Sequence, residues 1–417
     1  MEAMLVRGGN ALHGTIEISG AKNAVLPVLA ATVLHGGKYV LHNCPDITDV
    51  RDAVEILQTL GGQVTRTGNV LSVDTRELCC CAIPACLMLR MRASVLFLGP
   101  LLARFGKAVL TMPGGCPLGR RPIDLHLQAM ARMGAAVTLH EDRICCCAPM
   151  LHGCALCLPL PSVGATENAI MAATACHGTV TIENAAREPE VQDLIRFLQA
   201  MGAEIVGAGT DTLTITGMNT LHDADHTVMP DRIETATYLC AAAGCGGLVR
   251  LTGTDAETLL PVLEVLRQAG CEIAWSKHDI VLQSDGSLSA VERIETAPYP
   301  GLPTDAQALV MAALLRADGC STVTETIFDR RFSHVPQFRR FGACIEIAGP
   351  TARLQGVRHL NPAHAQAGDL RAAAALLIAA LQTKGESRIF GLKHLYRGYD
   401  NPEGKFTSLG ADISCLQ

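Results

Sequence analysis

Six segments have apolar residues at helical spacing, and each of them ends with the same pattern, apolar-x-x-apolar-Gly-small-x-Val/Ile. Glycine supplies the left-handed residue after a helix, and the β-branched residue opens a strand. Successive glycines lie 68 to 73 residues apart, a longer period than the 20 to 50 residues of common solenoid repeats. The pattern predicts six copies of one supersecondary block, marked by Gly61, Gly134, Gly202, Gly270, Gly342 and Gly410.

Each block also begins in a similar way. A glycine such as Gly106 or Gly178 precedes a short apolar strand, and a polar loop and an amphipathic helix follow. The remaining residues fit a second helix, as in Ala165 to Ala175 and Arg371 to Leu381. Two helices and three or four strands per block predict an α/β fold whose blocks group three and three.

A length of 417 residues exceeds the roughly 150 residues of a typical single domain. Ser19-Gly20 and Met229-Pro230 interrupt periodic segments and are candidate crossing points between two lobes. We therefore predict one discontinuous domain from residues 1–21 and 230–417 and a second from residues 22–229. Clefts between lobes commonly hold small molecules, so we expect the active site there.

Composition narrows the class of protein. Hydrophobic residues make up 49% and charged residues 18%, which excludes a disordered chain, and the net charge of −6 is wrong for a general nucleic-acid binder. The longest apolar stretches are half the ~20 residues needed to cross a bilayer, and no secretory signal opens the chain. With 18 clustered cysteines, these features favour a cytoplasmic protein without a membrane, nucleic-acid or obligate protein partner.

Basic residues gather in loops before helices, where free N–H groups already attract anions. Arg121 precedes Pro122 in a glycine-rich loop, and Lys22 opens an apolar helical run. A bound phosphate is one interpretation, and pairing of Arg121 with Asp124 or a solvated Lys22 is the other. Further loop arginines could complete a pocket for several anions: Arg331, Arg371 and Arg397.

Two other side chains are candidates for chemistry. Cys116 lies in the glycine-rich, arginine-flanked loop, a setting that activates a thiol, whereas most other cysteines occupy apolar segments. Asp305 lies in a proline-rich loop before an apolar helix, where it is either a helix cap or a base that reaches a substrate hydroxyl. Cys154 and Cys157 have the spacing of a pair of zinc ligands, but alternation along a strand would point their side chains to opposite faces. We expect no metal and no cofactor.

Long motifs follow one another in a fixed order along the chain. They are Ser19-Gly-Ala-Lys22-Asn23, Arg90-Met-Arg92, Gly114-Gly-Cys116 through His126, Ser162 to Asn168, Pro303-Thr-Asp305, Asp369-Leu-Arg371 and Arg397-Gly-Tyr399. On these motifs the chain resembles the UDP-N-acetylglucosamine 1-carboxyvinyltransferases over essentially its whole length. The resemblance implies a two-domain inside-out α/β barrel of six βαβαββ-like units, three per domain, in agreement with the glycine repeat.

The resemblance also implies an activity. Such enzymes transfer enolpyruvate from phosphoenolpyruvate to the 3′-hydroxyl of UDP-N-acetylglucosamine and release phosphate, which begins peptidoglycan precursor synthesis. Cys116 is then the general acid and the site of a phospholactoyl adduct and of alkylation by fosfomycin, and Asp305 accepts the hydroxyl proton. The implied ligands of phosphoenolpyruvate are Lys22, Asn23, Arg121, Arg331, Arg371 and Arg397, and those of the UDP-sugar are Arg92, Arg121, Pro122, Ile123, Asp124, Leu125, Ser162, Val163, Gly164, Asp305 and Ile327.

Two segments depart from the family pattern. Residues 329–333 differ around the retained Arg331, and Pro402 and Gly404 replace residues of a charged helix, which predicts a weaker helix in the last block. Two alternatives remain open, a 5-enolpyruvylshikimate-3-phosphate synthase-like transferase and a non-catalytic protein that binds a UDP-sugar. The cysteine at position 116 argues against the first, and retention of Cys116, Asp305 and Arg397 together argues against the second.

Overall fold

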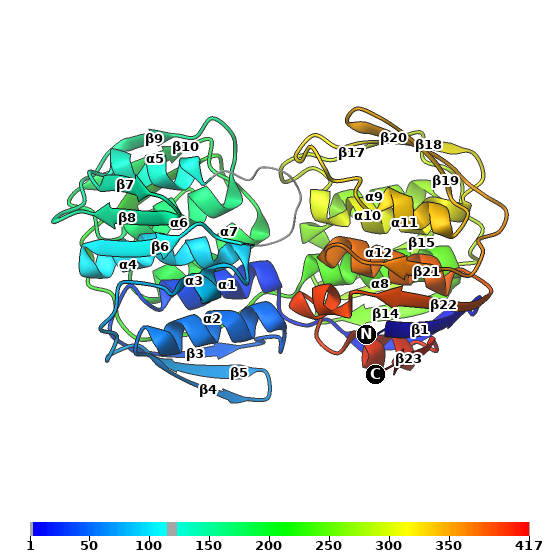
Figure 1. Cartoon of the computed structure of the whole chain (residues 1–417), viewed down its shortest axis with the longest axis horizontal. Helices are drawn as coiled ribbons and strands as arrows, with labels where there is room; N and C mark the ends of the chain where they lie inside the picture. Colours follow the sequence, from blue (N-terminus) through cyan, green and yellow to red (C-terminus); the bar gives the residue numbers. More distant parts are fainter. Residues whose placement is uncertain (1–2, 115–122, 417) are drawn as a thin grey trace. The chain divides into compact units, whose positions relative to one another are not determined.

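The computed structural model describes residues 3–114 and 123–416, and these residues form two compact units, coloured by sequence in Figure 1. Unit 1 contains the described residues up to Ser19 and from Pro230 onward, and unit 2 contains those from Gly20 to Met229. Each unit has its own hydrophobic core, and no buried apolar residue is shared between the two.

Unit 1 contains three four-stranded sheets. Their strand orders are β21 (His364–Gln366), β22 (Gly385–Phe390), β1 (Ala3–Gly8), β23 (Asp412–Leu416); β15 (Glu272–Trp275), β16 (Asp279–Ser284), β14 (Gly247–Thr252), β2 (Leu12–Glu17); and β17 (Arg293–Glu295), β18 (Cys320–Thr324), β20 (Thr351–Gln355), β19 (Cys344–Ala348).

Unit 2 contains two four-stranded sheets and one three-stranded sheet. Their orders are β11 (Glu204–Val206), β12 (Thr212–Thr216), β10 (Thr179–Glu183), β9 (Ala155–Cys157); β13 (Ala224–Thr227), β3 (Lys38–His42), β5 (Val70–Asp74), β4 (Gln63–Thr67); and β6 (Lys107–Thr111), β8 (Arg143–Cys147), β7 (Ala136–His140).

All six sheets share one topology. An edge strand runs parallel to its neighbour, and the other two pairings are antiparallel, as in the sheet of β17, β18, β20 and β19. Beside β6, an isolated parallel bridge from Ala82 to Val109 takes the place of the edge strand. Two of these edge strands are distant in sequence from the rest of their sheets. The early strand β2 is the parallel edge strand beside β14, and the late strand β13 is the parallel edge strand beside β3. The repeat therefore has the βαβαββ order, and the predicted α/β fold is confirmed.

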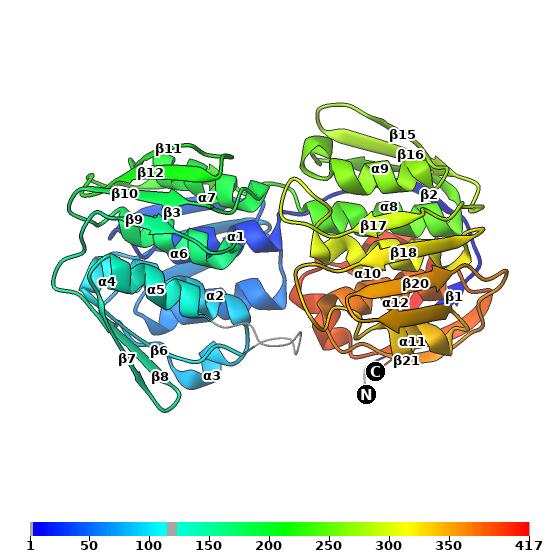
Figure 2. The same cartoon turned by 90° about the horizontal axis from the view of Figure 1, so that it is seen from above.

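The first helix of each block is largely buried. All residues of α12 (Leu370–Leu381) are buried, which is why its sequence is apolar all round rather than on one stripe. Figure 2 shows α8, α10 and α12 enclosed by the sheets of unit 1, where they pack on one another. The other members of this set are α1 (Lys22–Ala31), α4 (Leu98–Phe105), α6 (Val163–Ala173), α8 (Arg232–Cys245) and α10 (Thr304–Ala313).

The second helix of each block is amphipathic and ends at the repeated glycine. All six glycines have positive φ, between 85° and 106°, a conformation that glycine adopts without steric cost. The glycine repeat therefore predicted every one of these helix ends correctly. The helices are α2 (Thr48–Thr59), α5 (Asp124–Arg132), α7 (Pro189–Ala200), α9 (Leu260–Gln268), α11 (Val335–Arg340) and α13 (Pro402–Ser408), and shorter segments are α3 (Ala85–Met88), η1 (Arg92–Phe97), η2 (Ala256–Thr258), η3 (Leu314–Arg316) and η4 (Leu392–Arg397).

One expectation about the last block is wrong. Pro402 is the first residue of α13, a position where its missing N–H costs nothing and its fixed φ is favourable. The N–H of Gly404 donates to Oδ1 of Asn401 at 3.2 Å, so this glycine also contributes to the start of the helix. The unusual segment is a helix N-terminus rather than a weakened helix interior. Across the described ranges, no helix is long and apolar enough to span a bilayer.

Candidate active site

Asp305 in unit 1 is held by two arginines. Its Oδ1 accepts from Arg331 and its Oδ2 from Arg371, both at 2.7 Å. The two arginine side chains are 3% and 7% exposed, whereas that of Asp305 is 28% exposed. Pro303 occupies the N-cap position of α10, so Asp305 is not the helix cap that the sequence left open as an alternative. The structure thus brings three predicted site residues together.

Three carboxylates mark the N-termini of the packed helices α8, α10 and α12. Asp231 caps α8 through the N–H groups of Ile233 and Glu234, and Asp369 caps α12 through those of Arg371 and Ala372. Asp305 lies in the first turn of α10. Each negative charge is favourable there, because helix N-termini carry free N–H groups and positive dipole ends.

Arg371 remains cationic although it is buried. Burial disfavours its charged form, yet the pKa of the guanidinium is raised because the charges of Asp305, Tyr399 and Asp231 favour the cation. Tyr399 is itself buried, and burial raises the pKa of its hydroxyl to about 12. The hydroxyl lies 2.7 Å from that of Thr237. Arg397, half-buried at the end of η4, lies two residues before Tyr399.

Ile327 is connected to the same helix N-terminus by a buried carboxylate. Its N–H donates to Oε1 of Glu325 at 2.8 Å, and Oε2 of Glu325 accepts from the hydroxyl of Thr304 at 3.0 Å. Ile327 is 37% exposed. Glu325 was not among the predicted site residues, because its partner Thr304 is distant in sequence and no local motif marks it.

In unit 2, Lys22 pairs with a buried carboxylate. Its Nζ lies 2.7 Å from Oδ2 of Asp49, and the two side chains are 13% and 2% exposed. The solvated lysine that the sequence left open is therefore wrong. Asp49 lies in the first turn of α2, and no sequence signal connects it with Lys22. Asn23, the next residue of α1, is exposed.

A second cluster in unit 2 joins the starts of α5 and α6. Nδ1 of His126, in α5, lies 2.8 Å from Nδ2 of Asn168. Oδ1 of Asn168 accepts a hydrogen bond from the N–H of Gly99. Burial, together with the charge of Arg92, lowers the pKa of His126 to about 4, so its imidazole is neutral at pH 7. A Cβ at Gly164 would lie 3.1 Å from the His126 ring, which places this ring against the start of α6.

The remaining UDP-sugar candidates lie around these helix starts. Ser162 caps α6 by accepting from the N–H of Ala165, and Val163 is the first residue of that helix. Ile123 is buried, Asp124 opens α5 as an exposed residue, and Leu125 is half-buried. Cys116, Arg121 and Pro122 lie outside the described residues, so their predicted roles stay predictions. Among the described residues, no group of three or more His, Cys, Asp or Glu is arranged to hold a metal ion.

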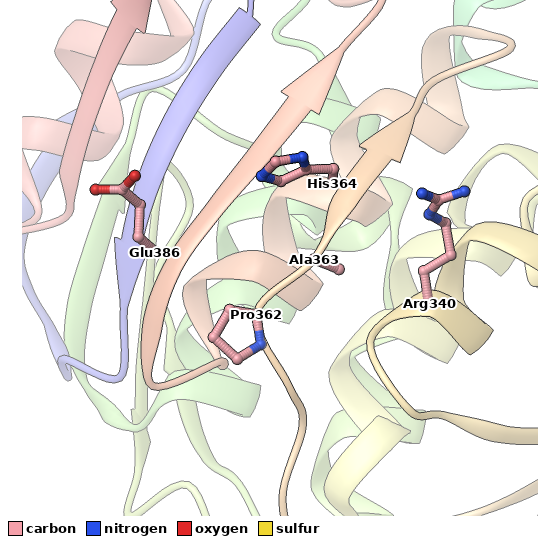
Figure 3. A pocket seen from close by; sticks show the side chains of 5 residues that line it. All are labelled: Arg340, Pro362, Ala363, His364 and Glu386. Carbon is pink, nitrogen blue, oxygen red and sulfur yellow. The ribbon is translucent and has the colours of Figure 1, made fainter.

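A surface hollow in unit 1 is separate from these clusters. Figure 3 shows that it lies beside β21 and β22 and is lined by none of the predicted site residues. Glu386 at its rim lies 3.4 Å from Arg7 and 3.7 Å from Arg388, in exposed ion pairs of small energetic weight. The other lining residues are Arg340, Pro362, Ala363 and His364.

Comparisons with known proteins agree with this arrangement. The family model described as EPSP synthase (3-phosphoshikimate 1-carboxyvinyltransferase) matches residues 6–406. A UDP-N-acetylglucosamine 1-carboxyvinyltransferase from Halorhodospira halophila is 46% identical and covers 99% of both chains, and a UDP-N-acetylglucosamine 1-carboxyvinyltransferase 2 from Caldanaerobacter subterraneus is 43% identical and covers 98% of both.

Solved structures show the same fold. The enolpyruvyl transferase NikO from Streptomyces tendae has a TM-score of 0.90 at 26% identity, covering 100% of this chain and 99% of NikO. EPSP synthase from Acinetobacter baumannii has a TM-score of 0.74 at 18% identity, covering 100% of both chains, and shows the fold alone. With these full-length relatives and the helix-terminal clusters described above, the chain belongs to the UDP-N-acetylglucosamine 1-carboxyvinyltransferase family of enolpyruvyl transferases.

Proposed function

We propose that this protein transfers enolpyruvate from phosphoenolpyruvate to the 3′-hydroxyl of UDP-N-acetylglucosamine and releases phosphate. The observation that carries the proposal is Asp305, a carboxylate at a helix N-terminus held between Arg331 and Arg371. It supplies a proton acceptor next to two cations, the combination needed where a hydroxyl attacks an anionic substrate. The product is a precursor of peptidoglycan.

The reaction proceeds by addition and elimination. The sugar oxygen bonds to C2 of phosphoenolpyruvate while its proton passes to Asp305, and Cys116 supplies a proton to C3. The resulting ketal then loses a proton from C3 as the C2–O bond to phosphate breaks, which restores the double bond. We assign the phosphate and carboxylate groups to Lys22, Asn23, Arg121, Arg331, Arg371 and Arg397.

Charge balance supports the role of Asp305. When Asp305 takes a proton, Arg331 and Arg371 lose the negative charge that now faces them at 2.7 Å. A substrate carboxylate or phosphate can then occupy their donors, so proton transfer and anion stabilisation reinforce each other. Surface arginines, already solvated, could not make this contribution.

We assign the nucleotide-sugar to the helix starts of unit 2 and to Ile327. Arg92, the segment from Arg121 through Pro122, Ile123 and Asp124 to Leu125, and the Ser162, Val163 and Gly164 turn would contact it. Free N–H groups at helix N-termini favour an anionic diphosphate over a cation. The seventeen cysteines in the described part are free thiols, which fits a cytoplasmic location.

Phosphate release from phosphoenolpyruvate tests the proposal. We expect release with UDP-N-acetylglucosamine, none with shikimate 3-phosphate, and none without an acceptor. Turnover with shikimate 3-phosphate but not with the UDP-sugar would overturn the substrate assignment. Binding of the UDP-sugar by calorimetry without phosphate release would show a binding protein rather than an enzyme.

A further inference from the structure

Two thiols outside the proposed active site meet on one face of a sheet in unit 2. Cys145 and Cys147 lie on β8, and their sulfur atoms are 3.7 Å apart. Residues i and i+2 of a strand point to the same face, and here Ile144 and Cys146 point to the buried face instead. The two thiols are both half-buried, so solvent reaches them.

The neighbouring strands leave space above the pair. Cys147 lies opposite Lys107 of β6 and Ala136 of β7, and Cys145 lies opposite Val109 and Thr138. Directly opposed residues in a sheet share one face at 4.5 to 5.5 Å between Cβ atoms. On the β7 side both neighbours are small, so no long side chain on that strand covers the sulfur atoms.

The spacing of the sulfur atoms matches two corners of a tetrahedron. Thiolates bound at about 2.3 Å to a tetrahedral ion stand about 3.8 Å apart. A disulfide would require them to approach to about 2.05 Å, and β8 is fixed by hydrogen-bonded partners on both sides. The rigid strand therefore presents a bidentate dithiol rather than a pair ready to oxidise.

The two sulfur atoms are also in hydrogen-bond contact, in which either atom can be the donor. The charged or titratable groups that face the pair are Cys81, Lys107 of β6, Arg143 of β8 and His140 of β7.

We propose that Cys145 and Cys147 form a two-thiolate site for a soft d10 metal ion such as Zn²⁺ or Cd²⁺. Soft thiolate ligands select such ions over Mg²⁺ or Ca²⁺. On binding, both S–H bonds break, two metal–sulfur bonds form, and two protons pass to solvent, while solvent ligands complete the coordination. The site is independent of the proposed transferase activity.

Cadmium titration of the reduced full-length chain tests the proposal, with thiolate-to-cadmium absorption as the readout. Loss of even a supporting contact around a metal typically weakens binding 10- to 100-fold, so Cys145→Ser or Cys147→Ser should each weaken one equivalent by at least about tenfold. Cys157→Ser, which removes an exposed thiol on β9, is the matched control and should leave that equivalent unchanged. An unchanged titration in either test variant would refute the site.

Proton release provides a second measurement. In weakly buffered solution, the Cd²⁺ equivalent that is weakened in Cys145→Ser and Cys147→Ser should release close to two protons per Cd²⁺ in the wild type. Release of one proton would mean binding to a single thiol and would overturn the proposal. Phosphate release by Cys145→Ser should equal that of the wild type, so this inference and the proposed function can fail separately.

Discussion

Arg371 donates to Oδ2 of Asp305 at 2.7 Å, which connects the N-termini of two neighbouring buried helices, α12 and α10. With Arg331 on Oδ1, the carboxylate has both oxygens bound and therefore one fixed orientation. Fixed orientation of a proton acceptor is what a reaction at one particular hydroxyl needs. The arrangement also means that no change at Asp305 leaves the two arginines unaffected.

Asp305→Asn tests this carboxylate with little change in volume. It removes the proton acceptor and leaves Arg331 and Arg371 without their anion, so kcat should fall by about 10²- to 10⁴-fold, the usual contribution of a general base. Phosphate release at saturating substrate measures the effect. Asp318→Asn, at an exposed carboxylate of unit 1, is the control. Activity of Asp305→Asn within about twofold of the control would exclude the assigned role.

Lys22 and Asp49 allow stability and substrate binding to be separated. Lys22→Met removes the cation that lies 2.7 Å from the buried carboxylate of Asp49 and should lower the free energy of unfolding by about 3 to 5 kcal/mol. Adding Asp49→Asn removes the negative charge that faced this lysine and should restore much of that stability, as measured by denaturant unfolding. Neither variant should recover activity, because the cation assigned to phosphoenolpyruvate is missing. Recovery of activity in the double variant would contradict that assignment.

Glu234 predicts a dependence of stability on pH. Burial raises its pKa from 4.5 to about 7, although Lys405 donates to it at 2.8 Å. The folded chain holds this proton more tightly than the unfolded chain, so the group stabilises the fold at low pH. Its contribution disappears as pH rises from about 4.5 to about 7, a loss of about 3 kcal/mol.

Glu234→Gln should remove that dependence. Denaturant unfolding at several pH values gives the difference in unfolding free energy between variant and wild type. This difference should change between pH 4.5 and about 7 and stay constant at higher pH. Asp255→Asn replaces another N-terminal carboxylate of unit 1, one that caps an exposed turn, and serves for comparison. A difference that does not vary with pH would show that Glu234 titrates normally.

Two buried histidines predict the opposite trend. Burial lowers the pKa of His126 and of His334 from 6.5 to about 4. Both must stay neutral in the folded chain, so stability should fall as pH drops from about 6.5 towards about 4. Their imidazole proton signals in NMR should not shift between pH 8 and pH 5, with exposed His359 as the comparison. A midpoint near 6.5 for His126 would contradict its burial.

The parts of the fold that local chemistry decides were predictable from the sequence. Glycine at a left-handed position is a local requirement, so Gly61 and its five counterparts marked real helix ends. Partners brought together by the fold were not predictable, such as Asp49 for Lys22 and Glu325 for Thr304. Pro402 was misinterpreted because it was placed inside a helix, whereas Asn401 is the N-cap of α13 and Pro402 its first residue.

The last prediction concerns Cys116, whose role rests on the sequence. Flanking arginines and a nearby helix start stabilise a thiolate, so fosfomycin, an epoxide, should alkylate Cys116 in preference to the buried thiols. The UDP-sugar should accelerate alkylation if its binding orders the site. Cys116→Asp retains an acid for C3 of phosphoenolpyruvate but removes the soft nucleophile, so it should keep activity and resist the epoxide. Peptide mapping after treatment measures the site: label on a peptide without Cys116, or full sensitivity of Cys116→Asp, would refute this role.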